Sequence, residues 1–384
     1  MKRNIYLKTI PPAEAIARVK ASIDREALIR EETIPSHEAS GRVLAHAVHA
    51  RYSSPTFHSA AMDGYAVNAR STFAAREGHP LTLKAGETCF AVNTGHPMPE
   101  GCDAVIMIEQ VVLDGDGVTI EAPAFPWQHV RRIGEDIVAT ELLFPRNHQL
   151  RPWDVGALLS GGIWDVPVWE RVTVRIIPTG DEVLDFTTHP DPGKGQVVES
   201  NSQMLAALAR ELGCVVERAA PVPDSPEALH QALKDSLDAG RHLTIFCAGS
   251  SAGSKDFTRA TLEKEGEILT HGIAAMPGKP SLLANCRGRL VAGAPGYPVS
   301  ALVCFKELLE PLISWLSHRE PPAKNRRPRR ADPYRAFPTG RRGTRARVHR
   351  AGRRQAGRHA ARTRGREHHH RHPRTGRRAH PRTG

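Results

Sequence analysis

The sequence predicts a multidomain α/β protein that ends in a disordered, arginine-rich segment, and three observations lead to this fold class. The 384 residues are too many for one ordinary hydrophobic core. Residues 171–316 alternate strand-like and helix-like patterns, whereas residues 51–144 contain short apolar runs broken by glycine, proline and aspartate. Beyond residue 316 the composition changes to arginine, glycine, histidine and proline.

The formal net charge of +12 comes from the end of the chain. Residues 319–384 contain 22 arginines and one lysine against three acidic residues, which is a net charge of +20. The preceding residues carry 30 basic and 38 acidic side chains, which is a net charge of −8. The basic isoelectric point therefore describes the terminal segment rather than the folded body.

Cysteine usage and hydropathy indicate the compartment. The six cysteines are scattered, form no CxxC pair and lie mostly inside apolar runs. This pattern favours buried free thiols over disulfides or a zinc site. No N-terminal apolar stretch is long enough for a signal peptide, and no window approaches the roughly 18 apolar residues of a membrane span. We therefore expect a soluble, cytoplasmic protein without a membrane partner.

The first half of the chain predicts a helical domain with a β-rich domain inserted in it. Residues 1–50 and 145–170 are assigned to the helical domain, and residues 51–144 to the insertion. A helix that begins at Pro12 has apolar residues at helical spacing. Residues 145–170 predict a second helix, which we expect to return and pack against the first.

Residues 171–316 predict a doubly wound α/β domain. The buried strands are RVTVRIIP, CVVERAAPV, HLTIFCAG and RLVAGAP. They alternate with helices that begin near Ser200 and at Ser225, and a last helix ends at Leu316. This alternation favours a parallel sheet with helices on both faces. In such sheets ligands bind at the carboxyl ends of the strands.

Polar turns follow the predicted strands at that edge. They are Thr179-Gly180-Asp181-Glu182, Cys247-Ala248-Gly249-Ser250-Ser251-Ala252-Gly253 with Asp256 beyond it, Pro277-Gly278-Lys279-Pro280, and Pro295-Gly296-Tyr297-Pro298. Small residues let backbone N–H groups approach an anion, and prolines on both sides restrict the lysine. Each turn alone also fits a structural role, as a helix N-cap, a tight turn or a solvated loop.

Two acidic turns in the first half extend this pattern. Asp63 lies in AMDGYA, and Asp136 lies in RRIGED. A turn aspartate is most often a local backbone acceptor. Several acids, together with one lysine on a proline-restricted loop, indicate a divalent cation bound with phosphate or another oxyanion. Mg²⁺ suits carboxylates combined with substrate phosphates.

In their order and spacing the motifs resemble the molybdopterin molybdenumtransferase family, the enzymes that insert molybdenum into molybdopterin. They are AAMDGYA, NTGHPMPEGCDAVIMIE, RRIGEDI, PTGDEV, ESNSQML, AGSSAGSKDF, PGKP and APGYPVSAL, between residues 10 and 316. The resemblance implies an N-terminal helical domain interrupted by a β-rich domain, and then an α/β domain similar to the molybdopterin adenylyltransferases. It also implies a small C-terminal β-barrel, which we expect to be missing here.

The resemblance implies roles for individual residues. Catalytic roles are implied for Asp63, Asp136, Glu182, Asp256 and Lys279, with Lys279 stabilising the charge of molybdate or of the departing phosphate. The implied Mg²⁺ ligands are Asp181, Glu182 and Asp256. The implied substrate-binding residues are Thr94, Thr179, Gly180, Asn201, Gly249, Ser251, Gly253, Gly278, Pro295 and Gly296.

The implied reaction is the Mg²⁺-dependent hydrolysis of adenylated molybdopterin, with insertion of molybdate into the dithiolene. The family also implies a homodimer with its active site near the subunit interface. Molybdopterin adenylyltransferase and molybdoenzyme apoproteins are the implied partners. Ala60, Ala248 and Tyr297 depart from the family pattern, so a tungstate preference or an inactive homologue stays open.

Residues 317–384 are predicted to be disordered, because Tyr334, Phe337 and Val348 are the only large apolar residues beyond position 317. Two interpretations of this segment stay open: it binds nucleic acid non-specifically through phosphate contacts, or it replaces the family's C-terminal domain after a frameshift. Two other functions also stay open. One is another enzyme with the same α/β domain, such as an adenylyltransferase or a nucleotide amidohydrolase. The other is a non-catalytic scaffold that acts through the basic segment.

Overall fold

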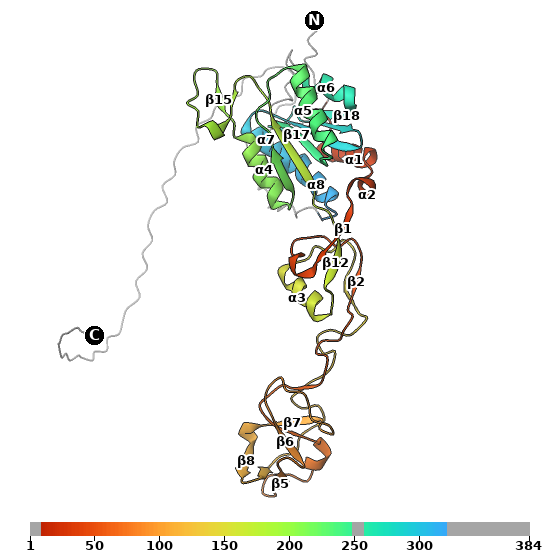
Figure 1. Ribbon diagram of the computed structural model, residues 1–384, viewed down its shortest axis with the longest axis vertical. Helices are drawn as coiled ribbons and strands as arrows, with labels where there is room; N and C mark the ends of the chain where they lie inside the picture. Colours follow the sequence, from red (N-terminus) through yellow and green to blue (C-terminus); the bar gives the residue numbers. More distant parts are fainter. Residues whose placement is uncertain (1–8, 248–256, 321–384) are drawn as a thin grey trace, which may run out of the picture. The chain divides into compact units, whose positions relative to one another are not determined.

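The computed structural model describes residues 9–247 and 257–320 of the chain (Figure 1). The described residues all belong to one compact unit, which ends at Lys324. The glycine-rich turn at 248–256 and the segment 321–384 lie outside the described residues. The predicted disorder of that segment and the missing barrel therefore stay predictions.

A six-stranded sheet with the order β16-β13-β17-β20-β19-β18 organises the C-terminal part of this unit. Its strands are β13 (Thr173–Pro178), β16 (Val215–Arg218), β17 (Leu243–Cys247), β18 (Gly266–His271), β19 (Leu282–Cys286) and β20 (Arg289–Ala294). The first four strands in the order are parallel, as predicted, whereas β19 and β18 extend the sheet antiparallel. The antiparallel pair was not predicted, because β18 follows helix α6 (Phe257–Glu265) with no turn between them.

Helices cover both faces of this sheet, because successive strand residues point to opposite sides. Ile176 and Ile245 join one core with the apolar residues of α4 and the C-terminal helices. Ile177 and Phe246 join a second core with α5 and α6. The remaining helices of this domain are α4 (Asn201–Glu211), α5 (Pro226–Asp238), α7 (Pro298–Cys304) and α8 (Glu310–Leu316). Two apolar cores on two faces confirm the doubly wound α/β fold class.

The closing helix, predicted as one element, is divided by a π-helical segment, η5 (Phe305–Leu309), between α7 and α8. Pro311 has no N–H, so one α-helical hydrogen bond is lost just after this segment. No helix among the described residues is long and apolar enough to cross a bilayer. The six cysteines are free, as predicted, and five of them are buried.

The N-terminal helix packs on the α/β sheet. Helix α1 (Pro12–Ser22) contacts β18, β19 and η5, and its buried Ala15 and Val19 belong to the first core. The expectation that it packs against the helix of residues 145–170 is wrong. That helix, α3 (Pro152–Ser160), buries Leu158 in a different cluster. The apolar faces of α1 and α3 are therefore buried in different hydrophobic clusters.

The helical segment around α3 is closed by strands from both sides of the insertion. β1 (Glu31–Pro35) pairs antiparallel with β12 (Asp165–Trp169), and β2 (Val48–His49) pairs with β11 (Leu142–Phe144). Two short helices, α2 (Arg25–Leu28) and η1 (Ser36–Glu38), complete the segment. The chain thus leaves after β2 and returns at β11 beside its point of departure.

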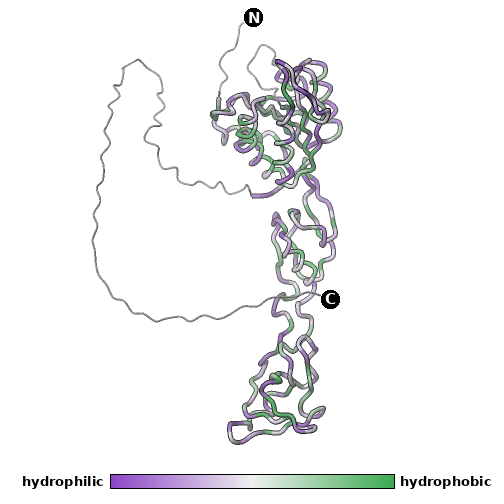
Figure 2. The backbone as a smooth tube through the Cα atoms, turned by 90° about the vertical axis from the view of Figure 1, so that its left-hand side faces the viewer, coloured by the Kyte–Doolittle hydropathy of each residue, from purple (hydrophilic) through white to green (hydrophobic). Residues whose placement is uncertain are grey.

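The intervening residues form small antiparallel sheets. β4 (Gly64–Val67) lies between β6 (Cys89–Val92) and β7 (Ala104–Met107), and β9 (Gly117–Ile120) lies between β5 (Leu81–Lys84) and β8 (Val111–Asp114). β3 (Ser59–Ala60) pairs with β10 (Val130–Arg131), and η2 (Ala69–Thr72) and η3 (Ile108–Gln110) are 3-10 turns. These elements enclose two small apolar clusters. Hydrophobic segments lie between hydrophilic ones along the backbone of the described residues (Figure 2).

Residues 317–319 belong to the folded body, so the expectation of disorder from residue 317 is wrong for them. His318 is buried and stacks on Trp169, with ring centroids 3.9 Å apart. Burial lowers the pKa of His318 to about 4, which keeps the ring neutral at pH 7. Arg319 donates hydrogen bonds to the carbonyls of Gly41 and Leu212. The composition of the segment does not predict these contacts, because His318 stacks on a distant aromatic ring and Arg319 bonds to backbone oxygens.

Substitution of Gly64 tests how closely β4 packs against its neighbours β6 and β7. A Cβ atom at this position would lie 2.0 Å from the carbonyl oxygen of Ile106 on the neighbouring strand. Gly64→Ala should therefore destabilise the sheet by about 1–3 kcal/mol and lower hydrogen-exchange protection in β4, β6 and β7. Gly156→Ala is the control, since no atom lies within 4 Å of that Cβ position in α3. It should stabilise its helix by about 0.5–1 kcal/mol. Unchanged protection in Gly64→Ala would show that the strands are not packed this closely.

Candidate functional site

The carboxyl edge of the parallel strands is where the predicted polar turns begin. β13, β17 and β20 pair in register, with their last residues opposite one another. The turn at Thr179 follows β13, the turn at Pro295 follows β20, and residues 248–256 follow β17. The starting points of three predicted turns are therefore brought to one edge. Gly249, Ser251, Gly253 and Asp256 lie outside the described residues.

Thr179 and Gly180 shape the first turn. The buried Thr179 donates from its N–H and from its hydroxyl to the carbonyl of Cys247, at 3.0 and 2.9 Å. The hydroxyl hydrogen bond thus links the end of β13 to the end of β17. Gly180 has φ +139°, and a Cβ atom there would lie 3.1 Å from the Glu182 carboxyl group. Glycine therefore lets the Glu182 side chain fold across the turn.

Asp181 and Glu182 are exposed carboxylates at this edge. Asp181 accepts a hydrogen bond from the backbone N–H of Asp224 at 3.1 Å. Neither carboxylate forms an ion pair with a basic side chain in the described part of the chain. No group of three or more potential ligands is assembled for a metal among the described residues, and the third predicted ligand is Asp256. Two uncompensated acids suit a Mg²⁺ ion that takes its other ligands from phosphate and water.

Asn201 connects the start of α4 to the turn after β20. Its Nδ2 donates to the carbonyl of Gly296 at 2.7 Å. Only the amide nitrogen can donate to a carbonyl, so this bond fixes which end of the side chain is Oδ1. Oδ1 is buried and has no hydrogen-bond partner among the described residues. Since a buried unpaired acceptor is unfavourable, Oδ1 is a ready acceptor for a ligand donor.

The loop that carries Lys279 packs on the same side of the domain. Gly278 is buried with φ +111°, and a Cβ atom there would lie 3.1 Å from Val303 in α7. Helix α7 begins at Pro298, immediately after the Gly296 turn. Lys279 is exposed, and its ammonium group has no partner in the described part of the chain. A free cation is therefore held on a loop anchored to this helix.

A second group of predicted residues lies in the inserted sheets. Asp63 accepts hydrogen bonds from the N–H and the hydroxyl of Thr94, at 2.7 and 2.9 Å. These two bonds lower the pKa of Asp63, the backbone bond more than the hydroxyl bond. Nη2 of Arg131 donates to both carboxylate oxygens of Asp136, at 2.9 and 2.8 Å. The strand of Arg131 pairs with β3, which leads into the Asp63 turn.

The two groups are not joined by any hydrogen bond or ion pair among the described residues. Asp63, Thr94 and Asp136 belong to the insertion, and the other described site residues belong to the α/β domain. A single site that contains both groups stays a prediction. Arg131 was not singled out from the sequence, although it stands in the RRIGED motif beside its partner.

An ion-pair network behind the first turn was missed by the sequence interpretation. Arg218 on β16 contacts Asp185 at 3.1 Å and the buried Glu199 at 3.5 Å. Glu199 also accepts hydrogen bonds from the N–H and hydroxyl of Ser202, at 2.7 and 2.5 Å. Ser200, the N-cap residue of α4 and one of two candidates (with Asn201) for this cap, forms no side-chain cap hydrogen bond, and Glu199 accepts from the Ser202 N–H instead. The network fixes the segment that joins the Glu182 turn to α4, and it leaves no local sequence signal because Arg218 lies on a different strand.

Two family models match most of the chain. The family model described as MoeA N-terminal region (domain I and II) matches residues 10–162, and the probable molybdopterin binding domain matches residues 175–315. A molybdopterin molybdenumtransferase from Haemophilus influenzae is 34% identical over 305 residues, covering 74% of this chain and 72% of that protein. One from Synechococcus elongatus is 32% identical over 301 residues, covering 73% and 74%.

Solved structures are similar as well. Two crystal structures of the molybdopterin biosynthesis MoeA protein from Pyrococcus horikoshii have TM-scores of 0.70 and 0.67 and are 29% and 27% identical to this chain. Each covers 82% of this chain, which corresponds to 81% and 80% of the two solved chains.

The Asp63–Thr94 contact can be tested by titration. Thr94→Val removes the hydroxyl bond but keeps the backbone bond, so the pKa of Asp63 should rise part of the way towards its ordinary value. The measurement is a pH titration of the Asp63 carboxyl carbon by NMR. Thr119→Val is the control, because its hydroxyl bonds to Thr82 instead. An unchanged pKa in Thr94→Val would mean that the hydroxyl bond is absent in solution.

Proposed function

Since the chain belongs to the molybdopterin molybdenumtransferase family, we propose that it hydrolyses adenylated molybdopterin and inserts molybdate into the dithiolene. Relatives with this name act in molybdenum cofactor biosynthesis, and that general role applies to this chain. The finer statements, including the Mg²⁺ requirement and the roles of single residues, are part of the proposal.

The observation that carries the proposal is a set of unpaired polar groups at the carboxyl edge of the sheet. Asp181 and Glu182 lack basic partners among the described residues, and Oδ1 of Asn201 lacks a donor. Lys279 likewise has no acidic partner in the described part of the chain. Folding does not favour a buried acceptor without a donor, such as Oδ1 of Asn201. A ligand with phosphates and polar ring edges would satisfy it and would also pair with the exposed charges of both signs at this edge.

The carboxylate oxygens of Asp181 and Glu182 are ligands of the type that Mg²⁺ prefers. Asp181 and Glu182 would hold the ion together with phosphate oxygens, and Asp256 is the proposed third ligand. When bound, the ion would neutralise charge on the phosphoanhydride.

The chain's own residues would bind and orient the substrate. The Asn201 amide would hold a donor of the pterin through Oδ1, while its other end keeps the Gly296 turn in place. The glycine-rich turn with Gly249, Ser251 and Gly253 would offer backbone N–H groups to phosphate. Lys279 would stabilise the negative charge on molybdate or on the departing phosphate. Thr179 would act by holding the turn rather than by touching the substrate.

The three site residues of the inserted sheets are proposed to act at a subunit interface. We propose a homodimer in which Asp63, Thr94 and Asp136 complete the active site. The two Thr94 hydrogen bonds lower the pKa of Asp63 and so favour its carboxylate form, which can bind a cation. A molybdopterin adenylyltransferase would supply the substrate, and molybdoenzyme apoproteins would receive the product.

The alternatives are weakened by the first half of the chain. An adenylyltransferase or amidohydrolase that shares only the α/β domain would not need the N-terminal region matched over residues 10–162. A tungstate preference stays compatible with every contact described, so the activity assay should offer molybdate and tungstate separately.

Two substitutions test the proposal. In Mg²⁺ buffer with adenylated molybdopterin and molybdate, Glu182→Gln and Lys279→Met should each lower the rate of AMP release by about 100-fold or more, because each removes charge stabilisation at the phosphoanhydride. Glu211→Gln and Lys234→Met are matched controls on exposed helix positions, and they should keep the parent rate. Parent-like rates in Glu182→Gln and Lys279→Met would remove the basis for this site.

A further inference from the structure

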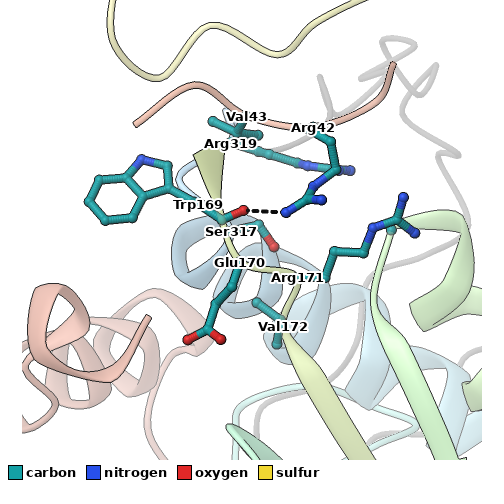
Figure 3. Close-up of a pocket in the computed structure, with 9 residues that line it drawn as sticks. Arg42, Val43, Trp169, Glu170, Arg171, Val172, Ser317 and Arg319 are labelled. Carbon is teal, nitrogen blue, oxygen red and sulfur yellow. Dashed lines mark hydrogen bonds between the residues drawn. The ribbon is translucent and has the colours of Figure 1, made fainter. Parts of the chain in front are cut away.

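A hollow lies beside the junction of β12 and β13, away from all the site residues described above. It is a small hollow that is open to solvent. Figure 3 shows that its lining comes from the turn after Gly41, the linker after β12 and the segment after α8. The lining residues are Arg42, Val43, Trp169, Glu170, Arg171, Val172, Gly213, Ser317 and Arg319. Three of them are arginines.

Only one of these arginines is neutralised. Arg42 is paired with Glu32 and also donates to the carbonyl of Trp169 at 2.9 Å. Arg319 donates to two backbone carbonyls, those of Gly41 at 2.7 Å and Leu212 at 2.8 Å. These oxygens carry no full charge, so they orient the guanidinium without neutralising it. Its Nε is buried and has no hydrogen-bond partner among the described residues.

Arg171 adds a second uncompensated charge. Its guanidinium forms no hydrogen bond or ion pair with a described residue, and its side chain is exposed. Glu170 does not balance it, because in Figure 3 the Glu170 carboxylate points away from Arg171. Oε1 of Glu170 accepts the backbone N–H of Arg30 at 2.7 Å and lies 3.5 Å from Nε2 of His242. No described carboxylate lies within ion-pair distance of Arg171 or Arg319.

The backbone is shaped to admit the Arg319 side chain. Gly213 has φ +80°, and a Cβ atom there would lie 2.7 Å from Nη2 of Arg319. Burial, together with the positive charges of Arg171 and Arg42, lowers the pKa of Arg319. A half-buried guanidinium with two like-charged neighbours and no acid is unfavourable unless an anion accompanies it.

We propose that this hollow binds a small tetrahedral oxyanion of the phosphate, sulfate and molybdate class between the guanidinium groups of Arg171 and Arg319. Planar guanidinium groups match the paired oxygens of such ions. The site is distinct from the edge that we assign to adenylated molybdopterin. A bound ion would join three segments of the chain, 41–43, 169–172 and 317–319, and would stabilise their packing.

The test is isothermal titration calorimetry of the full chain with inorganic phosphate, in chloride buffer at constant ionic strength. Arg171→Gln should weaken phosphate binding at least tenfold, and Arg319→Met should do the same. Arg342→Met removes one charge from the basic C-terminal segment and changes none of the lining residues, so it should bind phosphate within twofold of the parent. This control separates the site from general attraction to the many arginines of the segment.

If Arg319→Met fails to fold, Arg171→Gln decides the test, because the Arg171 guanidinium forms no hydrogen bond or ion pair with a described residue that its loss would break. Equal phosphate affinity in Arg171→Gln and the parent chain would overturn the proposal. A parallel titration with AMP separates free oxyanions from nucleotide phosphates. Arg171-dependent binding of AMP without any binding of inorganic phosphate would also overturn the assignment.

Discussion

The parallel pairing of β13, β17 and β20 is the constraint on which the candidate site depends. Equal register places the ends of these strands at one level, so turns that are far apart in the sequence begin at the same edge. The register also decides which side chains each core receives, since Ile176 faces one core and Ile177 the other. A shift of one residue would exchange the two faces of a strand and disrupt the packing of both cores.

Contacts outside the sheet then determine what each turn presents. The hydroxyl of Thr179 joins two strand ends, the amide of Asn201 holds the Gly296 turn, and Gly278 sits against α7. Behind them, Arg218 and Glu199 fix the segment that leads into α4. These structural bonds use backbone atoms and buried side chains. The acids and the lysine at the rim form no ion pair in the described part of the chain, which leaves their charges available to a ligand.

The fold class and most elements of the α/β domain follow from the sequence, because buried strands such as β13 and β17 are largely apolar runs and α5 has a clear N-cap at Ser225. Tertiary choices do not follow in the same way. Helix α1 has an apolar face that fits either α3 or the sheet, and only the packed structure shows which one it covers. His318 and Arg319 look like part of a basic segment, yet they are held by a ring stack and by carbonyl oxygens. The site residues were found through their motifs, whereas the Arg218 network joins side chains too far apart in the chain for a local pattern.

The central claim is that this edge of the sheet binds the pterin substrate, and a crystal structure of the full chain with molybdopterin tests it most directly. The account predicts a hydrogen-bond donor of the ligand within about 3.2 Å of Oδ1 of Asn201, with the ligand phosphate beside the turn at Gly296. A ligand bound elsewhere on the chain, with Oδ1 of Asn201 still unpaired, would contradict it.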